Sequence, residues 1–305
     1  MTILKLLSAA DEATIIEVLG REFPGLTVHT IGFLQKREDR CTIEINERLI
    51  FKFPFREKAW NEIVREKWVM NALQGRTSVA IPRPAFFMQT VRGYGYEKLP
   101  GVMLTDDYYW SLTEAQKQAF AVSMARFLSE LHHALRVADA VAAGLDVPDD
   151  PLSPSQLRRR LLPLLDGQEQ RSLVERMLEG YAQLNISAEP RVVLHNDLHG
   201  WNVLCDPVTA QLTGVLDFNG TCIGDAHLDF RYFFYPDPPL LEIVLAHYTR
   251  MNTPALSLRR CILYAVATDL TDLVYSTEEG RQVYDGSISA RIARLEQQLR
   301  SYELL

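Results

Sequence analysis

The sequence predicts an α+β protein in two lobes, an N-terminal five-stranded antiparallel sheet with a helix and a helix-rich C-terminal lobe. Between residues 27 and 99, short runs of β-branched and aromatic residues alternate with polar turns, a pattern typical of strands. Residues 57–73 instead place apolar side chains at helical spacing. Beyond residue 99 the helical period dominates. We therefore expect an N-terminal lobe over residues 1–98 and a C-terminal lobe over residues 99–305.

The N-terminal lobe is expected to begin with a helix and to carry strands on both sides of a second helix. Ser8 is a candidate N-cap for the first helix, over residues 9–21, where apolar residues recur every three or four positions. The second helix is the one over residues 57–73. The five strands are expected over residues 27–33, 41–45, 48–53, 85–89 and 93–99.

The C-terminal lobe is expected to be helical with one interruption. Thr113 and Gln116 have the spacing of a capping box at the start of a long helical segment. Two compact apolar strands, over residues 192–194 and 212–216, then break the helical pattern. Residues 240–305 indicate three further helices. The interruption matters for function because polar residues follow both of its strands.

Composition limits the classes of partner. The 305 residues are 47% hydrophobic, enough for a substantial core, and the net charge of -7 argues against binding to a nucleic-acid backbone. The same balance favours small cationic partners. The four cysteines form no C-x-x-C pair, and no apolar run is long enough for a membrane span. We expect a cytoplasmic monomer with reduced thiols and with neither a nucleic-acid nor a membrane partner.

The main functional signal is the spacing H-x-D-x-x-x-x-N at His195, Asp197 and Asn202, followed by Asp217 after the next strand. Phosphoryl transfer needs a carboxylate at the attacking hydroxyl and oxygen ligands that hold magnesium on the phosphates. Asp197 can accept the hydroxyl proton, while the Asn202 amide oxygen and the Asp217 carboxylate are hard ligands suited to Mg²⁺. Each residue alone is compatible with a polar turn, but their combination at two linked spacings favours a functional site.

Residues 193–230 resemble the catalytic core of the aminoglycoside phosphotransferase family, which shares the bilobal protein-kinase-like fold. Asp217-Phe218-Asn219 stands where kinases carry D-F-G, and Gly224-Asp225 with Asp229-Phe230 is similar to the family's G-D-x-x-x-D-F. The resemblance implies that Asp229, with His195, supports the catalytic loop without touching substrate. Asp225 by itself is better explained as the N-cap of a helix that starts near residue 226.

In the N-terminal lobe the resemblance points to Lys52 and Glu66. Lys52 lies among apolar strand residues in the order F-K-F-P, which is most similar to the 2″-phosphotransferase branch, and Glu66 lies on the following helix. In the family, the strand lysine holds the α and β phosphates and a helix glutamate fixes it. Tyr96, Glu97 and Lys98 stand at the expected hinge, where backbone groups would bind the base of ATP or GTP.

The loop over residues 34–40 departs from the family pattern because it contains no glycine. Glycine lets backbone N–H groups approach phosphate oxygens closely, so backbone cradling of phosphate is not expected here. Lys36 or Arg37 could contact phosphate through the side chain. A solvated charged hairpin explains the same residues, and both hypotheses stay open.

The acceptor substrate is expected on the C-terminal lobe. Aromatic residues after Asp229 are followed by helices that carry four carboxylates, Asp269, Asp272, Glu278 and Glu279. Such a rim suits aminoglycosides, whose ammonium groups carboxylates can hold by charge-assisted hydrogen bonds. For any one of these residues, a solvated helix face is the alternative. The resemblance thus implies an Mg²⁺-dependent kinase of a small-molecule hydroxyl, with an aminoglycoside antibiotic, and hence resistance, as the favoured case.

Three alternatives stay open. The acceptor could be another alcohol, such as a macrolide, a choline-like compound or a sugar. His195, Asp197, His199 and Asp217 could instead form a transition-metal hydrolase site, although this leaves the lysine and glutamate of the N-terminal lobe without a role. The third alternative, suggested by the glycine-free loop, is a nucleotide-binding module without turnover.

Overall fold

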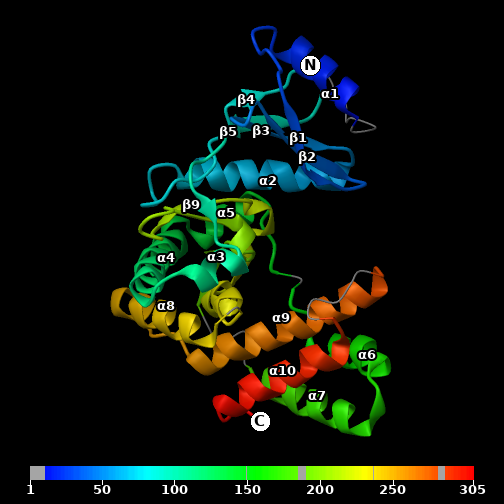
Figure 1. The fold of residues 1–305 in the computed structure, drawn as a ribbon, viewed down its shortest axis with the longest axis vertical. Coiled ribbons are helices and arrows are strands. Elements are labelled where there is room, and N and C mark those ends of the chain that lie inside the picture. The colour runs from blue at the N-terminus through cyan, green and yellow to red at the C-terminus, as the bar shows by residue number, and fades with distance from the viewer. Residues whose placement is uncertain (1–10, 149, 185–189, 236, 281–285) are drawn as a thin grey trace.

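The computed structural model describes residues 11–148, 150–184, 190–235, 237–280 and 286–305. Figure 1 shows a lobe built on a sheet and a second, mainly helical lobe. The sheet has five strands in the order β1-β2-β3-β5-β4, and each neighbouring pair is antiparallel. The fold class expected from the sequence is confirmed.

The sheet of the N-terminal lobe is buried between two helices. Its strands are β1 (Ile31–Lys36), β2 (Arg40–Ile45), β3 (Leu49–Pro54), β4 (Phe86–Phe87) and β5 (Tyr94–Glu97). Helix α1 (Glu12–Glu22) shares one core with alternate sheet residues such as Ile43. Helix α2 (Glu57–Leu73) lies between the sheet and the helical lobe (Figure 1), and residues such as Tyr94 join its core. Strand β3 contributes to both cores because its side chains alternate between faces: Phe51 joins the core with α1, and Ile50 joins the core with α2.

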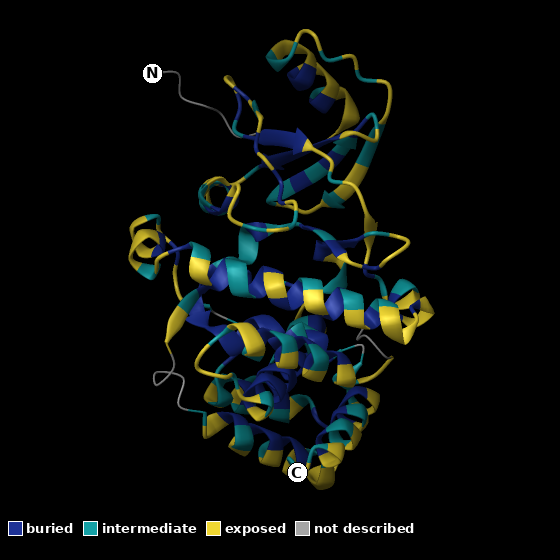
Figure 2. Ribbon diagram, turned by 90° about the vertical axis from the view of Figure 1, so that its left-hand side faces the viewer, coloured by how far each residue is buried: buried dark blue, intermediate teal, exposed yellow. Residues whose placement is uncertain are grey.

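The helical lobe contains two small sheets among its helices. The bounds are β6 (Val102–Met103), α3 (Asp106–Ser111), α4 (Glu114–Ala134), α5 (Val137–Ala142), α6 (Pro154–Leu161), η1 (Leu162–Leu164), α7 (Gly167–Ala182), β7 (Arg191–Leu194), η3 (Gly200–Asn202), β8 (Val203–Cys205), β9 (Leu212–Val215), η4 (Phe218–Gly220), β10 (Cys222–Asp225), η5 (Ala226–Phe233), α8 (Pro238–Met251), α9 (Leu258–Glu278) and α10 (Ile288–Ser301). The small sheets are β10-β7 and β6-β8-β9. Figure 2 shows that buried residues gather in the interior of this lobe, while exposed residues follow the outward sides of its helices.

The segment after α2 ties the two lobes together. Ala80 donates its N–H to the Thr213 carbonyl at 2.9 Å and accepts from the Val215 N–H at 3.0 Å. Strand β9 of the helical lobe is therefore hydrogen-bonded to the segment that leads back to the sheet.

Most element predictions are confirmed, and the first strand is the main correction. The helix over residues 57–73, the capping box at Thr113 and the three final helices are present. The first strand begins at Ile31 and not at residue 27, because the Asn46 side chain bonds the backbone of residues 27, 29 and 30. The predicted cap Ser8 lies outside the described residues, and Asp11 caps α1.

Two expectations drawn from composition can be compared with the structure. The four cysteines are buried and are thiols, not members of disulfides. Of the helices in the described ranges, none combines the length and the apolarity that a membrane span requires.

Asp225 joins η5 to α9 through a buried network. It caps η5 by accepting the His227 N–H at 3.1 Å, which agrees with the expected N-cap. The same carboxylate accepts from His227 Nδ1 at 2.5 Å, Arg260 Nε at 2.6 Å and the Tyr264 hydroxyl at 3.0 Å. Burial raises the pKa of Asp225, but His227 and Arg260 lower it more, so the pKa lies below its usual value.

We expect Asp225→Asn to lower the free energy of unfolding at pH 7 by about 3–5 kcal/mol, because the substitution removes the carboxylate from its buried ion pair with Arg260. A lowered native pKa stabilises the fold above the unfolded pKa and is lost as pH falls through the native pKa. The difference between variant and wild type should therefore shrink in acid. Urea unfolding at several pH values measures it, with the exposed Asp139→Asn as control. Equal unfolding midpoints for Asp225→Asn and wild type would contradict this role.

Candidate active site

Asp229 holds the loop after β7 through hydrogen bonds to its backbone. This carboxylate is fully buried and accepts the backbone N–H groups of His195 at 3.0 Å and Asn196 at 2.6 Å. His132 of α4 bonds it through Nε2 at 3.0 Å. Burial raises the pKa of Asp229, but His132 and the loop donors outweigh burial and hold it below its usual value. The loop that carries Asp197 is therefore tied to an ionised, buried side chain.

His195 is also engaged on both ring nitrogens. Nε2 lies 2.9 Å from the Leu216 carbonyl, to which it must donate, and Nδ1 accepts the Asp197 N–H at 3.3 Å. Burial lowers the pKa of His195, so the ring is neutral. Neither nitrogen is available to a metal ion. In the described ranges no group of three or more His, Cys, Asp or Glu is arranged to hold one, so this geometry does not favour the hydrolase alternative.

Asp197 is positioned between two side chains. Its Oδ2 accepts from Asn202 Nδ2 at 3.0 Å, and its Oδ1 accepts from the Tyr232 hydroxyl at 3.3 Å. About 36% of the Asp197 side chain is exposed, so a substrate can reach it. Burial raises the pKa of Asp197, but the neighbouring His199 lowers it more, and the pKa lies below its usual value. The group is an ionised carboxylate at neutral pH.

Asn202 completes the loop and is hydrogen-bonded to it through the amide nitrogen. Its Nδ2 donates to the Asp197 carbonyl at 2.8 Å as well as to the carboxylate. In the described part of the chain no donor engages Oδ1, which stays available as a ligand. The loop can follow this path because Gly200 has no side chain: a Cβ there would stand 2.0 Å from the Leu104 carbonyl oxygen.

Asp217 faces the N-terminal lobe across the site. It has a left-handed backbone, with φ of 56°, and Oδ1 accepts from Lys52 Nζ at 3.1 Å and Asn219 Nδ2 at 2.8 Å. Burial raises the pKa of Asp217, but Lys52 lowers it more. With the Asn202 oxygen, this carboxylate forms a hard donor pair that fits Mg²⁺.

Lys52 and Glu66 form a buried ion pair. Lys52 Nζ lies 2.6 Å from Glu66 Oε1, and the other glutamate oxygen accepts from the Tyr94 hydroxyl at 2.8 Å. Burial lowers the pKa of Lys52, but the charges of Glu66 and Asp217 raise it well above its usual value. The lysine is thus a fixed cation. Sequence reasoning missed Tyr94, whose role depends on strand register. Glu62, one turn earlier on α2, pairs with Arg40 instead.

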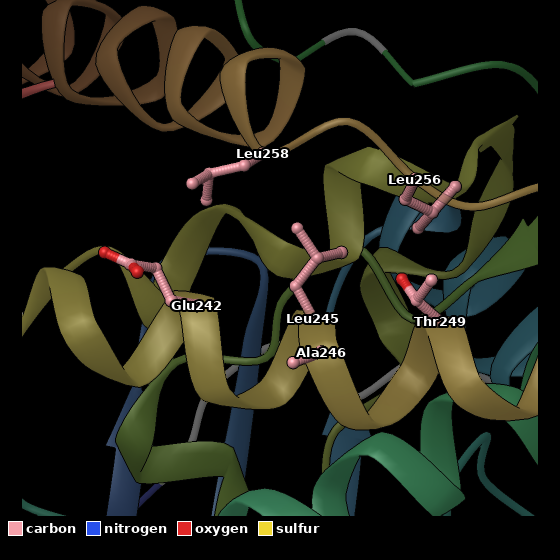
Figure 3. A pocket seen from close by; sticks show the side chains of 6 residues that line it. All are labelled: Glu242, Leu245, Ala246, Thr249, Leu256 and Leu258. Carbon is pink, nitrogen blue, oxygen red and sulfur yellow. The ribbon is translucent and has the colours of Figure 1, made fainter.

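Two of the hollows on the described part of the surface differ in their lining. One, of about 360 Å³, lies between the lobes and is lined by Gln35, Arg37, Arg40, Glu62, Asp197, Asp217, Asn219 and Gly220. The other, of about 310 Å³, lies between α8 and the start of α9 (Figure 3) and is lined by Glu242, Leu245, Ala246, Thr249, Leu256 and Leu258. Only the first contains residues expected from the sequence to act in catalysis.

The predicted hinge residues lie at the end of β5. Tyr96 is buried, and Glu97 is exposed. The Lys98 N–H donates to the Arg48 carbonyl at 2.7 Å, and its Nζ lies 2.6 Å from Glu44. The Lys98 N–H is therefore satisfied by the residue directly before β3, the strand with which Tyr96 and Glu97 pair.

The four carboxylates expected to bind substrate have different surroundings. Asp269 is buried and bonds Arg291 with both oxygens, so it ties α9 to α10 and we do not retain it as a substrate ligand. Glu278 pairs with Arg160. Glu279 is exposed at the end of α9. Asp272 is half-buried. Burial raises the pKa of Asp150, and the charge of nearby Asp272 raises that pKa further. The charge of Asp197 also raises the pKa of Asp150, so Asp150 is near both Asp197 and Asp272.

Arg231 is a buried residue that sequence reasoning missed. It is 1% exposed and donates to both the side-chain and the backbone oxygen of Asn196, each at 2.7 Å. Its Nη2 also lies 3.5 Å from Asp150. Asn196 precedes Asp197 and has a left-handed φ of 65°. Arg231 therefore holds Asn196 through its oxygens, while Asp229 holds it through its N–H. The only sequence signal was its place directly after Asp229-Phe230.

We expect Arg231→Lys to lower kcat about tenfold or more, because one ammonium cannot replace the two guanidinium bonds to Asn196. KM for the nucleotide should stay within about twofold, since Lys52 and Asp217 are untouched. Steady-state kinetics together with a thermal melt tests this, with Arg126→Lys on the exposed face of α4 as control. An unchanged kcat in a folded variant would show that Arg231 does not position the loop.

The sheet lobe, the buried lysine–glutamate pair and the loop with Asp197 and Asn202 define a class: this is the kinase-like fold of small-molecule phosphotransferases. Residues 34–259 match the family model described as the phosphotransferase enzyme family. The chain belongs to this family of phosphotransferases.

Solved structures with the same fold include both aminoglycoside and macrolide phosphotransferases. The GDP and kanamycin complex of APH(2″)-IIIa is 22% identical, with a TM-score of 0.80, over 95% of this chain and 99% of that one. ADP-bound APH(2″)-Ib is 23% identical, with a TM-score of 0.68, over 94% and 97%. The macrolide 2′-phosphotransferase MphH from Brachybacterium faecium is 21% identical, with a TM-score of 0.64, over 92% and 96%. At these identities the likeness establishes the fold.

Proposed function

We propose that the protein transfers the γ-phosphoryl group of ATP or GTP to a hydroxyl of a small molecule, with an aminoglycoside as the first candidate acceptor. The observation that carries this proposal is the ionised, accessible Asp197 in one cavity with Asp217, beside the Lys52–Glu66 pair. A base for the hydroxyl, oxygen ligands for a metal and a cation for the phosphates are the parts that phosphoryl transfer requires.

In this mechanism Asp197 accepts the proton of the attacking hydroxyl as the new P–O bond forms. The bond between the γ-phosphorus and the nucleotide oxygen breaks in the same in-line step, and nucleoside diphosphate leaves. Tyr232 and Asn202 hold the two oxygens of Asp197, so the base approaches in one orientation. The chain forms no covalent intermediate.

Asn202 and Asp217 would hold Mg²⁺ with the nucleotide. When bound, the metal neutralises charge on the β and γ phosphates. Lys52 would bind the α and β phosphates, held in place by Glu66. His195 and Asp229 would support the loop without touching substrate, because both are buried beneath it. Tyr96, Glu97 and Lys98 would frame the base of the nucleotide.

The acceptor is proposed from charge. The chain carries a net charge of -7, and Asp150 lies near enough to Asp197 and Asp272 for their charges, after burial, to raise its pKa. Such carboxylates suit ammonium groups. The likeness to the kanamycin complex supports an aminoglycoside, and the likeness to MphH supports a macrolide as the second candidate. We place the reaction in the cytoplasm, catalysed by a monomer, and an aminoglycoside acceptor would make the protein a resistance enzyme.

The function is tested by coupled nucleotide turnover with ATP and GTP in Mg²⁺, over aminoglycosides, macrolides and small metabolite alcohols, with mass spectrometry of each acceptor. A phosphorylated aminoglycoside is the expected product. A different phosphorylated alcohol would leave a kinase with another acceptor. Tight nucleotide binding with no product from the whole panel would instead support the module without turnover.

We expect Asp197→Ala to abolish turnover while nucleotide affinity and melting temperature stay close to wild type, because the side chain is partly exposed and does not support the fold. Loss of a positioned base typically costs about 10²–10⁴-fold in rate. Turnover and nucleotide titration on the same preparation measure both effects. A near-normal rate would remove Asp197 from the catalytic role.

We expect Asp217→Ala to lose the magnesium dependence of nucleotide binding, because it removes the charged member of the Mg²⁺ donor pair. Binding without Mg²⁺ should change much less. Titration of ATP or GTP with Mg²⁺ and with EDTA separates these effects. If Mg²⁺ strengthens binding to the variant as much as to wild type, Asp217 is not a metal ligand.

A further inference from the structure

The strand register places a polar row on the cleft side of the N-terminal sheet. Direct strand partners share a face, and the partners form one continuous row of four residues: Gln35, Thr42, Lys52 and Tyr94. Lys52 and Tyr94 are the members bound to Glu66. Gln35, on the edge strand β1, is therefore on the nucleotide side of the sheet.

A β-bulge at Leu34 decides which hairpin side chains reach this side. Phe33 pairs with Ile43, yet Gln35 pairs with Thr42, so one residue of β1 has no partner. Lys36 then pairs with Cys41 on the opposite face, where its Nζ lies 5.2 Å from the Phe33 ring. Without the extra residue, simple alternation from Phe33 would have turned Lys36 toward the cleft.

Beyond Lys36 the alternation returns Arg37 to the cleft side. Arg37 lines the cavity that contains Asp197 and Asp217, and its Nε and Nη2 lie 3.2 Å from the Gln35 amide oxygen in the orientation that satisfies both groups. Gln35 thus supports the guanidinium at the mouth of the cavity.

The second arginine of the hairpin is already committed. Arg40 pairs with both Asp39 and Glu62, which fixes the hairpin to α2. Arg37 makes no ion pair with any carboxylate of the described ranges. Of the three carboxylates that line the cavity, Glu62, Asp197 and Asp217, the first pairs with Arg40. A lining cation that has no ion pair of its own is suited to an anion that enters the cavity.

We propose that Arg37 binds the γ-phosphate of the nucleotide and thereby replaces the backbone N–H groups that a glycine-containing loop would supply. This inference rests on the proposed function. The γ-phosphate is assigned because Arg37 shares its cavity with Asp197, the proposed base, whereas the α and β phosphates fall to Lys52. The guanidinium fork can bond two phosphate oxygens at once, and during transfer it would stay on the phosphoryl group.

The test compares Mg²⁺-dependent binding of a non-hydrolysable triphosphate and of the corresponding diphosphate to the full chain by titration calorimetry. Arg37→Gln should weaken triphosphate binding about tenfold or more, the loss of one charge-assisted pair, and diphosphate binding less than about threefold. Arg37→Lys should fall between, because it keeps the charge but not the fork. Lys36→Gln, one residue away on the other face, is the matched control and should bind both as wild type does.

The contrary results are distinct. Wild-type affinity of Arg37→Gln for the triphosphate would overturn the inference and leave the proposed function intact. Equal losses for triphosphate and diphosphate would overturn the γ-phosphate assignment, as would an equal loss in Lys36→Gln, which would indicate a diffuse charge effect. A wild-type protein that binds neither nucleotide would overturn the proposed function itself.

Discussion

The buried carboxylate of Asp229 is the contact on which the site depends. A carboxylate at 0% exposure costs several kcal/mol unless it is paired and hydrogen-bonded. Here the compensation comes from His132 and from two consecutive N–H groups of the catalytic loop. The loop cannot move away without leaving this charge unsatisfied. Because Asp197 follows these two residues directly, the direction of its side chain is set by an interaction beneath the site.

Left-handed backbone lies where the site needs sharp changes of direction. Asn196 and Asp217 both have left-handed φ values, which asparagine and aspartate adopt more readily than other residues with a side chain. Arg231 holds Asn196 by both of its oxygens, and Lys52 holds the side chain of Asp217. Each of these two residues is thus held by a buried cation.

In the N-terminal lobe, strand register decides which side chains face the cleft. A shift of one residue would carry Lys52 to the α1 side of the sheet, away from Glu66 and Asp217. The matched pairing of β2, β3 and β5 prevents this, and the bulge on β1 changes face only on the edge strand. The cleft-facing side of the lobe is therefore specified by backbone pairing, and its chemistry by the side chains that this pairing selects.

The sequence by itself determined the features that depend on neighbours along the chain. The helix over residues 57–73, the Thr113 capping box, and the order of Asp197, Asn202 and Asp217 after apolar strands all follow from local periodicity and spacing. Only the tertiary structure decided that Asp269 binds Arg291 and that Arg231 bonds Asn196. It also decided that Arg37, and not Lys36, faces the cleft. These outcomes depend on strand register and on partners far apart in the chain. Local patterns carry no record of either, because a side chain's partner is chosen by the packing of whole elements.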